Sequence, residues 1–314
     1  MTKTAITKTA GEAAIAKHDL STKNTRKLLA RYRVEDGKKF RLKDHDPGDT
    51  GGHLMNKDEA TAILSLGVER LADQQERLYA QSDWAMLCLF QAMDAAGKDG
   101  TIKHVMSGVN PQGVDVTSFK APGAEALDHD FLWRSNRALP ARGKIGIFNR
   151  SYYEELLVVR VHPELLSKQK LPKDRVTKHI WKERFEAICA YERYLNQQGT
   201  LVMKFFLNLS KEEQKRRFLS RLDHPEKNWK FSSADLTERG RWDDYQDAYE
   251  EMIRGTATQD APWYVVPADN KWFSRLVVVA AMDERLKSLD LKFPEVDPAE
   301  KARLAEARVA LEQE

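Results

Sequence analysis

Residues 90–105, FQAMDAAGKDGTIKHV, place glycines and a lysine directly after an apolar run, as a phosphate-binding loop does. Gly97 and Lys98 match the glycine–lysine pair of a Walker A loop, in which backbone N–H groups and the ammonium bind phosphate oxygens. Two positions depart from that pattern, because Ala92 replaces its first glycine and Asp99 replaces its serine or threonine. The stretch therefore predicts a phosphate site with unusual acidic residues.

Asp94 lies inside this loop, where a carboxylate repels bound phosphates unless a cation lies between them. This makes Asp94 a candidate Mg²⁺ ligand, directly or through water. The alternative is a carboxylate that caps the turn through its own backbone. Asp99 is expected to be the N-cap of a helix that begins near Thr101.

The phosphate contacts are expected to come from the loop and the first helical turn. Lys98 is expected to bridge the transferring phosphates. The residues predicted to bind phosphate here are Gly97, Lys98, Gly100, Thr101 and Lys103. The alternative is a tight turn with an incidental lysine, which the apolar run before it and the helical pattern after it disfavour.

A second candidate group follows the apolar run at 143–149, in the stretch IFNRSYYE. In P-loop enzymes the end of such a strand usually has an acid, the Walker B residue, but Asn149 occupies that position here. The next residue, Arg150, can stabilise charge on a transferring phosphoryl group. Its alternative role is an ion pair with a local acid such as Glu154.

Five apolar runs predict the strands that position these residues: 84–91, 114–119, 143–149, 200–209 and 261–269. Helical patterns separate them, at 56–81 with Asn56 as N-cap, from about Thr101, at 124–139, at 174–199 and at 272–289. Buried strands that alternate with helices predict an α/β fold, with a five-stranded parallel sheet covered on both faces.

One polar helical stretch, 211–257, interrupts this alternation and has too few apolar residues for an independent domain. We expect it to be a helical lid that excludes water from the phosphates. Arg217 and Arg221 lie four residues apart, on one helix face. The alternative for each such charge is a solvated surface.

The whole chain is predicted to divide into three parts: a mobile basic arm at 1–30, a main domain at 31–290 and a peripheral helix at 291–314. Residues 1–43 hold twelve Lys and Arg against four Asp and Glu, although the net charge of the whole chain is only +3. This basic segment is either a solvated arm or a site that recruits a polyanion.

Composition excludes several classes of protein. The chain has 314 residues, of which 41% are hydrophobic and 32% charged, as expected for a globular protein with a large core. No apolar run reaches the roughly 18 residues of a membrane span, and the N-terminus lacks the apolar segment of a secretory signal. Cys88 and Cys189 are predicted to be buried free thiols in a reducing cytoplasm.

Four stretches together resemble the family-2 polyphosphate kinases: AMDAAGKDGTIKHVMSGVNPQG, GKIGIFNRSYYEELLVVRVH, RRFLSRLDHPEKNWKFSSADLTERGRWDDYQDAYEEMI and APWYVVPADNKWFSRL. The resemblance runs from about Tyr32 to Leu289. It implies a P-loop kinase-like three-layer α/β/α sandwich with a helical lid. It also implies Mg²⁺-dependent phosphoryl transfer between inorganic polyphosphate and a nucleotide such as AMP, ADP or ATP, in an enzyme that commonly forms homo-oligomers.

The resemblance also implies roles for single residues. By it, Asp94 is metal-associated and Lys98 binds phosphate. It supports the assignment of three lid cations as phosphate ligands, namely Arg217, Arg221 and Lys230. It adds Arg134, as a residue lining the polyphosphate path, and Asp235, as a weaker candidate in the lid.

The chain departs from its relatives at Asn149, because they often have Asp in a DRSWYNR motif. The N-R-S-x-Y-E form resembles the subclass that phosphorylates both AMP and ADP. We therefore expect Asn149 to select between acceptors.

Two other functions are open at this point. An ATP-dependent nucleoside-phosphate kinase would have a similar loop and lid. A nucleic-acid-binding protein could use the basic arm, but the remainder of the chain has more Asp and Glu than Lys and Arg and shows no recognition motif. We therefore expect no nucleic-acid or membrane partner.

Overall fold

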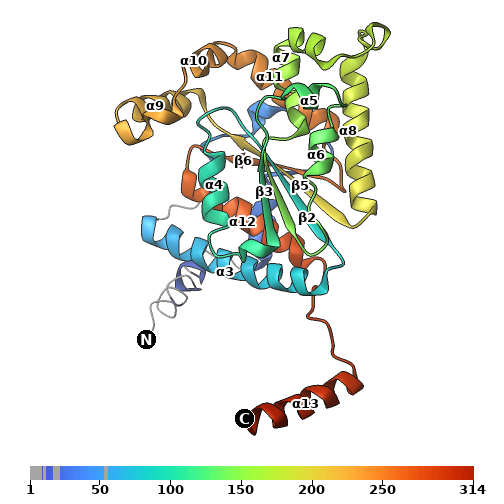
Figure 1. Cartoon of the computed structure of the whole chain (residues 1–314). Helices are drawn as coiled ribbons and strands as arrows, with labels where there is room; N and C mark the ends of the chain where they lie inside the picture. Colours follow the sequence, from blue (N-terminus) through green and yellow to red (C-terminus); the bar gives the residue numbers. More distant parts are fainter. Residues whose placement is uncertain (1–8, 10–11, 17–21, 53–55) are drawn as a thin grey trace.

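A sheet of six strands forms the centre of the molecule (Figure 1). The computed structural model describes residues 9, 12–16, 22–52 and 56–314. The strands are β1 Arg33–Val34, β2 Ala85–Gln91, β3 Val114–Ser118, β4 Ile145–Asn149, β5 Thr200–Asn208 and β6 Trp263–Pro267. They lie in the order β1-β6-β5-β2-β4-β3, and β2 to β6 run parallel.

All five predicted strands are confirmed, and β1 is an addition at the edge. It pairs antiparallel with β6 through Arg33↔Tyr264 and Val34↔Trp263. Two residues are too few to give a periodic pattern, so the sequence could not predict this strand. The central strands β2, β5 and β6 are buried along their whole length, as expected of a parallel sheet covered on both faces.

Helices cover both faces of the sheet, which confirms the predicted α/β/α sandwich. On one face pack α3 (Lys57–Gln81), α12 (Lys271–Lys287), α4 (Lys98–Val105) and α2 (Thr22–Leu29). On the other pack α8 (Ile180–Gln197), α11 (Trp242–Thr256) and the short α7 (Val158–Val161). Asn56 is the predicted N-cap of α3: its side chain accepts from Glu59 N, and the Glu59 carboxylate accepts from Asn56 N.

Two predicted helices are shorter in the structure than the sequence pattern indicates. The stretch 124–139 is broken into α5 (Ala124–Leu127) and α6 (Trp133–Arg137), because the Asp130 carboxylate accepts from Leu132 N and turns the chain between them. The helix predicted at 174–199 begins only at Ile180, after a short 3-10 turn, and ends at Gln197.

The stretch between β5 and β6 is helical as predicted, and the described residues 209–262 contain no strand. It forms α9 (Lys211–Leu222), α10 (Ser233–Gly240) and α11. The predicted lid is nevertheless too long, because α11 packs into the core through Trp242, Tyr249 and Met252. Only α9, α10 and the turn between them, residues 211–240, project at the edge of the molecule (Figure 1). We call residues 211–240 the lid segment.

The basic N-terminal segment is not a mobile arm where the structure describes it. Residues 12–16 are helical, and Ala14 is buried against Ile63 of α3 and Leu276 of α12. In α2, Leu29 is buried and Arg26 forms an ion pair with Glu284. Apolar residues at helical spacing explain this packing. The prediction for residues 1–8, 10–11 and 17–21 lies outside the described residues.

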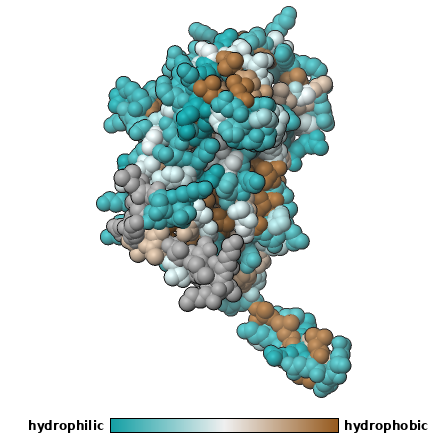
Figure 2. All heavy atoms as spheres, turned by 90° about the vertical axis from the view of Figure 1, so that its left-hand side faces the viewer, coloured by the Kyte–Doolittle hydropathy of each residue, from teal (hydrophilic) through white to brown (hydrophobic). Residues whose placement is uncertain are grey.

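The C-terminal residues form a helix, α13 (Pro298–Glu312), whose side chains are all exposed. Figure 1 shows it standing away from the rest of the chain, and Figure 2 shows apolar side chains along it. They include Leu304, Val309 and Leu311.

Two further expectations concern the whole chain. Both cysteines of the described part are free thiols; Cys88 is buried as predicted, whereas Cys189 is only half-buried, with Sγ 3.4 Å from Gly255 O. Among the described helices, none has the length and apolar character needed to cross a membrane.

Candidate functional site

The loop between β2 and α4 carries the predicted phosphate site at the carboxyl end of the central strand. Helix α4 begins at Lys98, three residues earlier than predicted, with Gly97 as its N-cap. Gly97 has φ +100°, a left-handed conformation that favours glycine. At Gly100, an added Cβ would meet no heavy atom of the described residues within 4 Å apart from its chain neighbours and the backbone of its own helix, so this side of the first helical turn is open to a ligand. The prediction that Asp99 caps this helix is wrong, because Gly97 holds that position.

Lys98 lies within the loop rather than in solvent. Its Nζ donates to Ala92 O at 2.8 Å, and the side chain is buried. Burial and the nearby Arg150 guanidinium lower the pKa of Lys98, and the carboxylates of Asp94 and Glu154 oppose that shift. The ammonium therefore lies among the charged groups of the loop, where an anionic ligand would stabilise its charged form.

Arg150 joins the end of β4 to this loop. Its Nη2 lies 3.1 Å from Asp94 Oδ1, and its Nη1 lies 3.5 Å from Glu154 Oε2. The predicted alternative, an ion pair with Glu154, therefore exists together with a pair to Asp94. Arg150 has φ +62°, an uncommon conformation for a residue with a side chain. Such strain at a strand end is typical of functional sites.

Glu154 is a site residue that the sequence presented only as a possible partner of Arg150. Burial raises the pKa of Glu154, and Arg150 and Lys98 oppose the shift. The Gln91 amide, with its nitrogen toward Glu154, donates to Glu154 Oε1 at 2.9 Å. The acid four residues after Arg150 was the signal that could have indicated it.

The acids at the loop fit a magnesium ion that substrate phosphates help to bind. No group of three or more His, Cys, Asp or Glu in the described part of the chain is placed to hold a metal by itself. Mg²⁺ usually binds one or two carboxylates, with phosphates and waters completing its shell. Asp94 is 34% exposed and its carboxylate points at Arg150 instead of capping the loop, so it suits this role.

Asn149, the last residue of β4, also contacts the loop helix. Its Nδ2 donates to Asp99 Oδ1 at 2.7 Å. Of the two other predicted phosphate ligands in α4, Thr101 is buried and Lys103 is exposed on the helix surface.

Arg217, predicted to bind phosphate, contacts the backbone of the phosphate loop in this structure. From α9 it donates to four carbonyl oxygens, those of Ala95, Ala96, Ala268 and Asp269, and to Glu213 Oε1 at 2.6 Å. Gln214 adds a bond from Nε2 to Asp94 O at 3.0 Å. All three nitrogens of the guanidinium are thus engaged with the protein. Helix α9 clamps the backbone of the phosphate loop.

We predict that Arg217→Gln lowers both the melting temperature and kcat, since the loop loses its clamp. Misplacement of reacting groups by about 1 Å can cost on the order of 100-fold in rate. The matched control is Arg216→Gln, because Arg216 pairs with the same Glu213 but is 75% exposed. If Arg217→Gln instead raised only the KM for a phosphate substrate, with kcat and melting temperature unchanged, Arg217 would be a ligand after all.

The other lid candidates pair with one another. Arg221 lies 3.5 Å from Asp235 Oδ2 and donates to Lys230 O at 3.1 Å. Asp235 also accepts from Ser232 N at 3.4 Å, which caps α10. Burial and the Asp94 carboxylate raise the pKa of Asp235, so this lid acid is within electrostatic reach of the loop. The Lys230 side chain is exposed.

A cavity of about 260 Å³ adjoins Arg150 and Glu154. Its wall includes Lys120, Phe131 and Arg134, as well as the apolar Val158. Arg134 donates to Lys120 O at 2.7 Å, and its guanidinium lies 5.6 Å from the centre of the Phe119 ring. Arg134 thus lines the same cavity as Arg150 and Glu154, and its role on a polyphosphate path stays a prediction.

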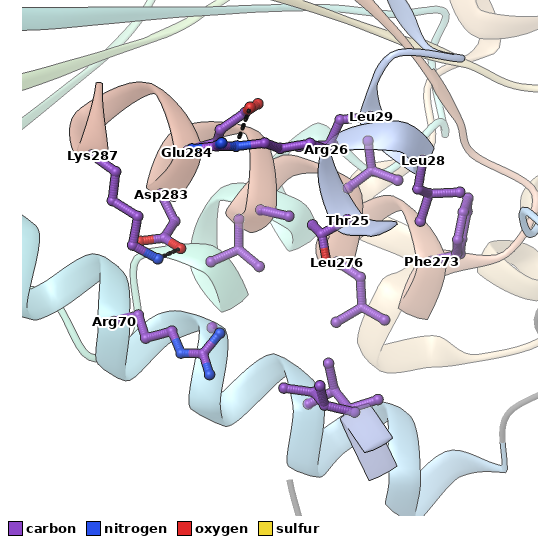
Figure 3. A pocket seen from close by; sticks show the side chains of 16 residues that line it. Thr25, Arg26, Leu28, Leu29, Arg70, Phe273, Leu276, Asp283, Glu284 and Lys287 are labelled. Atoms are coloured by element: carbon purple, nitrogen blue, oxygen red, sulfur yellow. Dashed lines mark hydrogen bonds and ion pairs between the residues drawn. The ribbon is translucent and has the colours of Figure 1, made fainter. Parts of the chain in front are cut away.

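A second cavity, of about 100 Å³, lies away from the loop, between α2, α3 and α12 (Figure 3). Its floor is apolar, with Leu29, Phe273 and Leu276. Ion pairs of Arg26 with Glu284 and of Lys287 with Asp283 lie at its rim. The phosphate-loop residues do not line it, so it is separate from the candidate site.

The strand order, the lysine loop after the central strand β2 and the helical segment after β5 define a P-loop kinase-like phosphotransferase. The family model of polyphosphate kinase 2 matches residues 54–294. The chain belongs to the polyphosphate kinase 2 family, which confirms the resemblance seen in the sequence.

Named relatives cover nearly the whole chain. An ADP-polyphosphate phosphotransferase of Rhodopseudomonas palustris is 50% identical, covering 89% of this chain and 97% of its own. An AMP/ADP-polyphosphate phosphotransferase of Meiothermus ruber is 44% identical, covering 86% and 97%. The crystal structure of polyphosphate kinase 2 from Arthrobacter aurescens TC1 is 41% identical, with a TM-score of 0.79, and covers 87% of this chain and 95% of that one.

Proposed function

We propose that this protein transfers a phosphoryl group from inorganic polyphosphate to AMP and ADP, forming ADP and ATP, with Mg²⁺ as cofactor. The observation that carries the proposal is the convergence of Lys98, Asp94 and Arg150 at one end of the sheet. The names of the relatives support the donor, because each is a polyphosphate phosphotransferase, and the Meiothermus ruber enzyme supports both acceptors.

The chemistry requires two polyanions to meet. The terminal phosphoanhydride bond of polyphosphate breaks while an oxygen of the nucleotide's last phosphate forms a bond to the transferred phosphorus. That acceptor oxygen is already ionised near neutral pH, since phosphate monoesters have a second pKa of about 6. The protein therefore contributes position and positive charge rather than a general base.

Each residue of the site has a part in this step. Lys98 binds the donor end of the transferred group, and Arg150 stabilises its equatorial oxygens. Asp94 would hold Mg²⁺, which would supply positive charge to the phosphates. On closure of the lid segment, Arg221 and Lys230 would contact phosphate oxygens and exclude water.

The cavity beside Arg150 suits the acceptor nucleotide. Arg134 and Lys120 attract its phosphate, and the Phe131 ring offers an aromatic face to a base. A nucleotide in this cavity would direct its terminal phosphate toward Arg150 and the loop.

The test is incubation of the protein with AMP, Mg²⁺ and polyphosphate, without ATP, followed by separation of the nucleotides. We expect ADP to appear first and ATP afterwards. A parallel reaction with AMP and a non-adenine nucleoside triphosphate, without polyphosphate, tests the ordinary nucleoside-phosphate kinase. Product only in that second reaction would refute the proposal.

We predict that Asn149→Asp alters the choice between AMP and ADP. It adds a negative charge near the acceptor phosphates and replaces the 2.7 Å bond to Asp99 by repulsion between carboxylates. The ratio of kcat/KM values should change by about tenfold, which corresponds to roughly 1.4 kcal/mol. The control is the exchanged pair Asn149→Asp/Asp99→Asn, which keeps one amide and one carboxylate. If both acceptors lost activity in parallel, Asn149 would be structural and not selective.

A further inference from the structure

A buried polar cluster lies beneath the turn that carries Arg150. Lys204, in the middle of β5, donates from Nζ to Glu192 Oε2 at 2.6 Å, to Thr256 O at 2.8 Å and to Tyr153 Oη at 3.1 Å. The hydroxyls of Tyr152 and Tyr153 both donate to the other oxygen, Glu192 Oε1, at 2.9 and 2.7 Å. Each of these side chains is at most 3% exposed.

Stability alone does not explain this cluster. Burial lowers the pKa of Lys204, and the Glu192 carboxylate opposes that shift, so the ion pair mainly offsets a desolvation cost that burial itself creates. Replacement of such buried pairs by apolar residues of similar volume is often neutral or stabilising. A fully satisfied polar network can, however, fix the arrangement of the segments that it joins.

The two tyrosines connect the cluster to the site. Tyr152 and Tyr153 begin the 3-10 turn Tyr152–Glu155, which Ser151 caps by accepting from Tyr153 N at 3.2 Å. Arg150 precedes this turn in its left-handed conformation, and Glu154 lies within it. The strained Arg150 backbone is thus followed, after Ser151, by two side chains anchored at a single carboxylate.

We propose that Glu192, held by Lys204, is a positioning residue for phosphoryl transfer: through the Tyr152 and Tyr153 hydroxyls it fixes the turn that presents Arg150 and Glu154 to the phosphate loop. The inference rests on the proposed function for the role of Arg150. The four residues of this network, Tyr152, Tyr153, Glu192 and Lys204, lie outside the phosphate loop and the lid segment. They belong to α8, β5 and the turn after β4.

The first test removes the two hydroxyls in Tyr152→Phe/Tyr153→Phe. We expect kcat to fall by about 10- to 100-fold, as for a small displacement of reacting groups, with little change in the KM for polyphosphate. Amide hydrogen exchange in residues 149–156 should become faster. The matched control is Tyr191→Phe, which removes a hydroxyl bonded to Asn136 Oδ1 outside the cluster. A lower melting temperature with wild-type kcat below that temperature would overturn the proposal.

The second test separates the acceptor oxygen from the ion pair. Glu192→Gln/Lys204→Met keeps a carbonyl oxygen for both tyrosines, whereas Glu192→Leu/Lys204→Met removes it at similar volume. We expect the first pair to retain most of the kcat and the second to lose it. Equal activity in the two would refute the positioning role. If the wild-type protein showed no polyphosphate-dependent transfer, the proposed function would fail, while the hydrogen-exchange result would still report on the network.

Discussion

Lys98→Ala should lower kcat by about 10²–10³-fold, the loss typical for removal of one electrostatic contact to a reacting group. The fold should remain intact, because Nζ has a single carbonyl partner, Ala92 O, and its charge is costly in the buried loop. Circular dichroism and the melting temperature would check the fold, and nucleotide product formation would give kcat. Lys144→Ala is the matched control, since Lys144 pairs with Asp115 at the opposite end of β4.

Near wild-type turnover in Lys98→Ala would show that the loop is a tight turn with an incidental lysine. Loss of both turnover and melting temperature would mean that the bond to Ala92 O holds the loop together, and that Lys98 acts through structure.

Asp94→Asn is expected to be as damaging as the change at Lys98, about 10²–10³-fold in kcat. Asn keeps the shape of the side chain but removes the charge that would hold Mg²⁺. Excess Mg²⁺ should restore little activity. The experiment is a Mg²⁺ titration of the rate, with Asp115→Asn as a control for loss of an exposed carboxylate.

The titration also separates the two roles that the structure allows for Asp94. Its carboxylate pairs with Arg150, so a loss of rate by itself does not identify a metal ligand. Loss of a metal ligand changes the Mg²⁺ concentration at which the rate is half-maximal. If that concentration stayed the same, Asp94 would act only as the partner of Arg150.

The sequence was most informative where local patterns determine structure. Long apolar runs marked the five parallel strands, and the glycine–lysine pair after β2 marked the loop, because a buried strand and a left-handed glycine each need particular residue types. The end of β4 was found in the same way, and the structure brings Asn149 and Arg150 into contact with Asp99 and Asp94 there.

The sequence was least informative where a charged side chain bonds to backbone atoms far away along the chain. Arg217 resembled a phosphate ligand on a polar helix, yet its partners are carbonyls of the phosphate loop and of the end of β6, far away in the chain. Lys204 interrupts an apolar strand, and only the fold brings Glu192 and the tyrosines to it. The prediction of one helix at 124–139 was wrong for a local reason, because the Asp130 side chain accepts from the backbone N–H of Leu132.

The phosphoryl group is expected to pass directly from polyphosphate to a nucleotide at the Lys98 loop. This transfer is tested most directly by a single-turnover reaction with polyphosphate that carries a radioactive terminal phosphate, together with AMP and Mg²⁺ and without ATP. We expect the label to appear in the β-phosphate of ADP as the first labelled product, and Lys98→Ala to slow this transfer by about 10²–10³-fold. Label released only as inorganic phosphate, or label in ADP at an equal rate in Lys98→Ala, would contradict direct transfer at this loop.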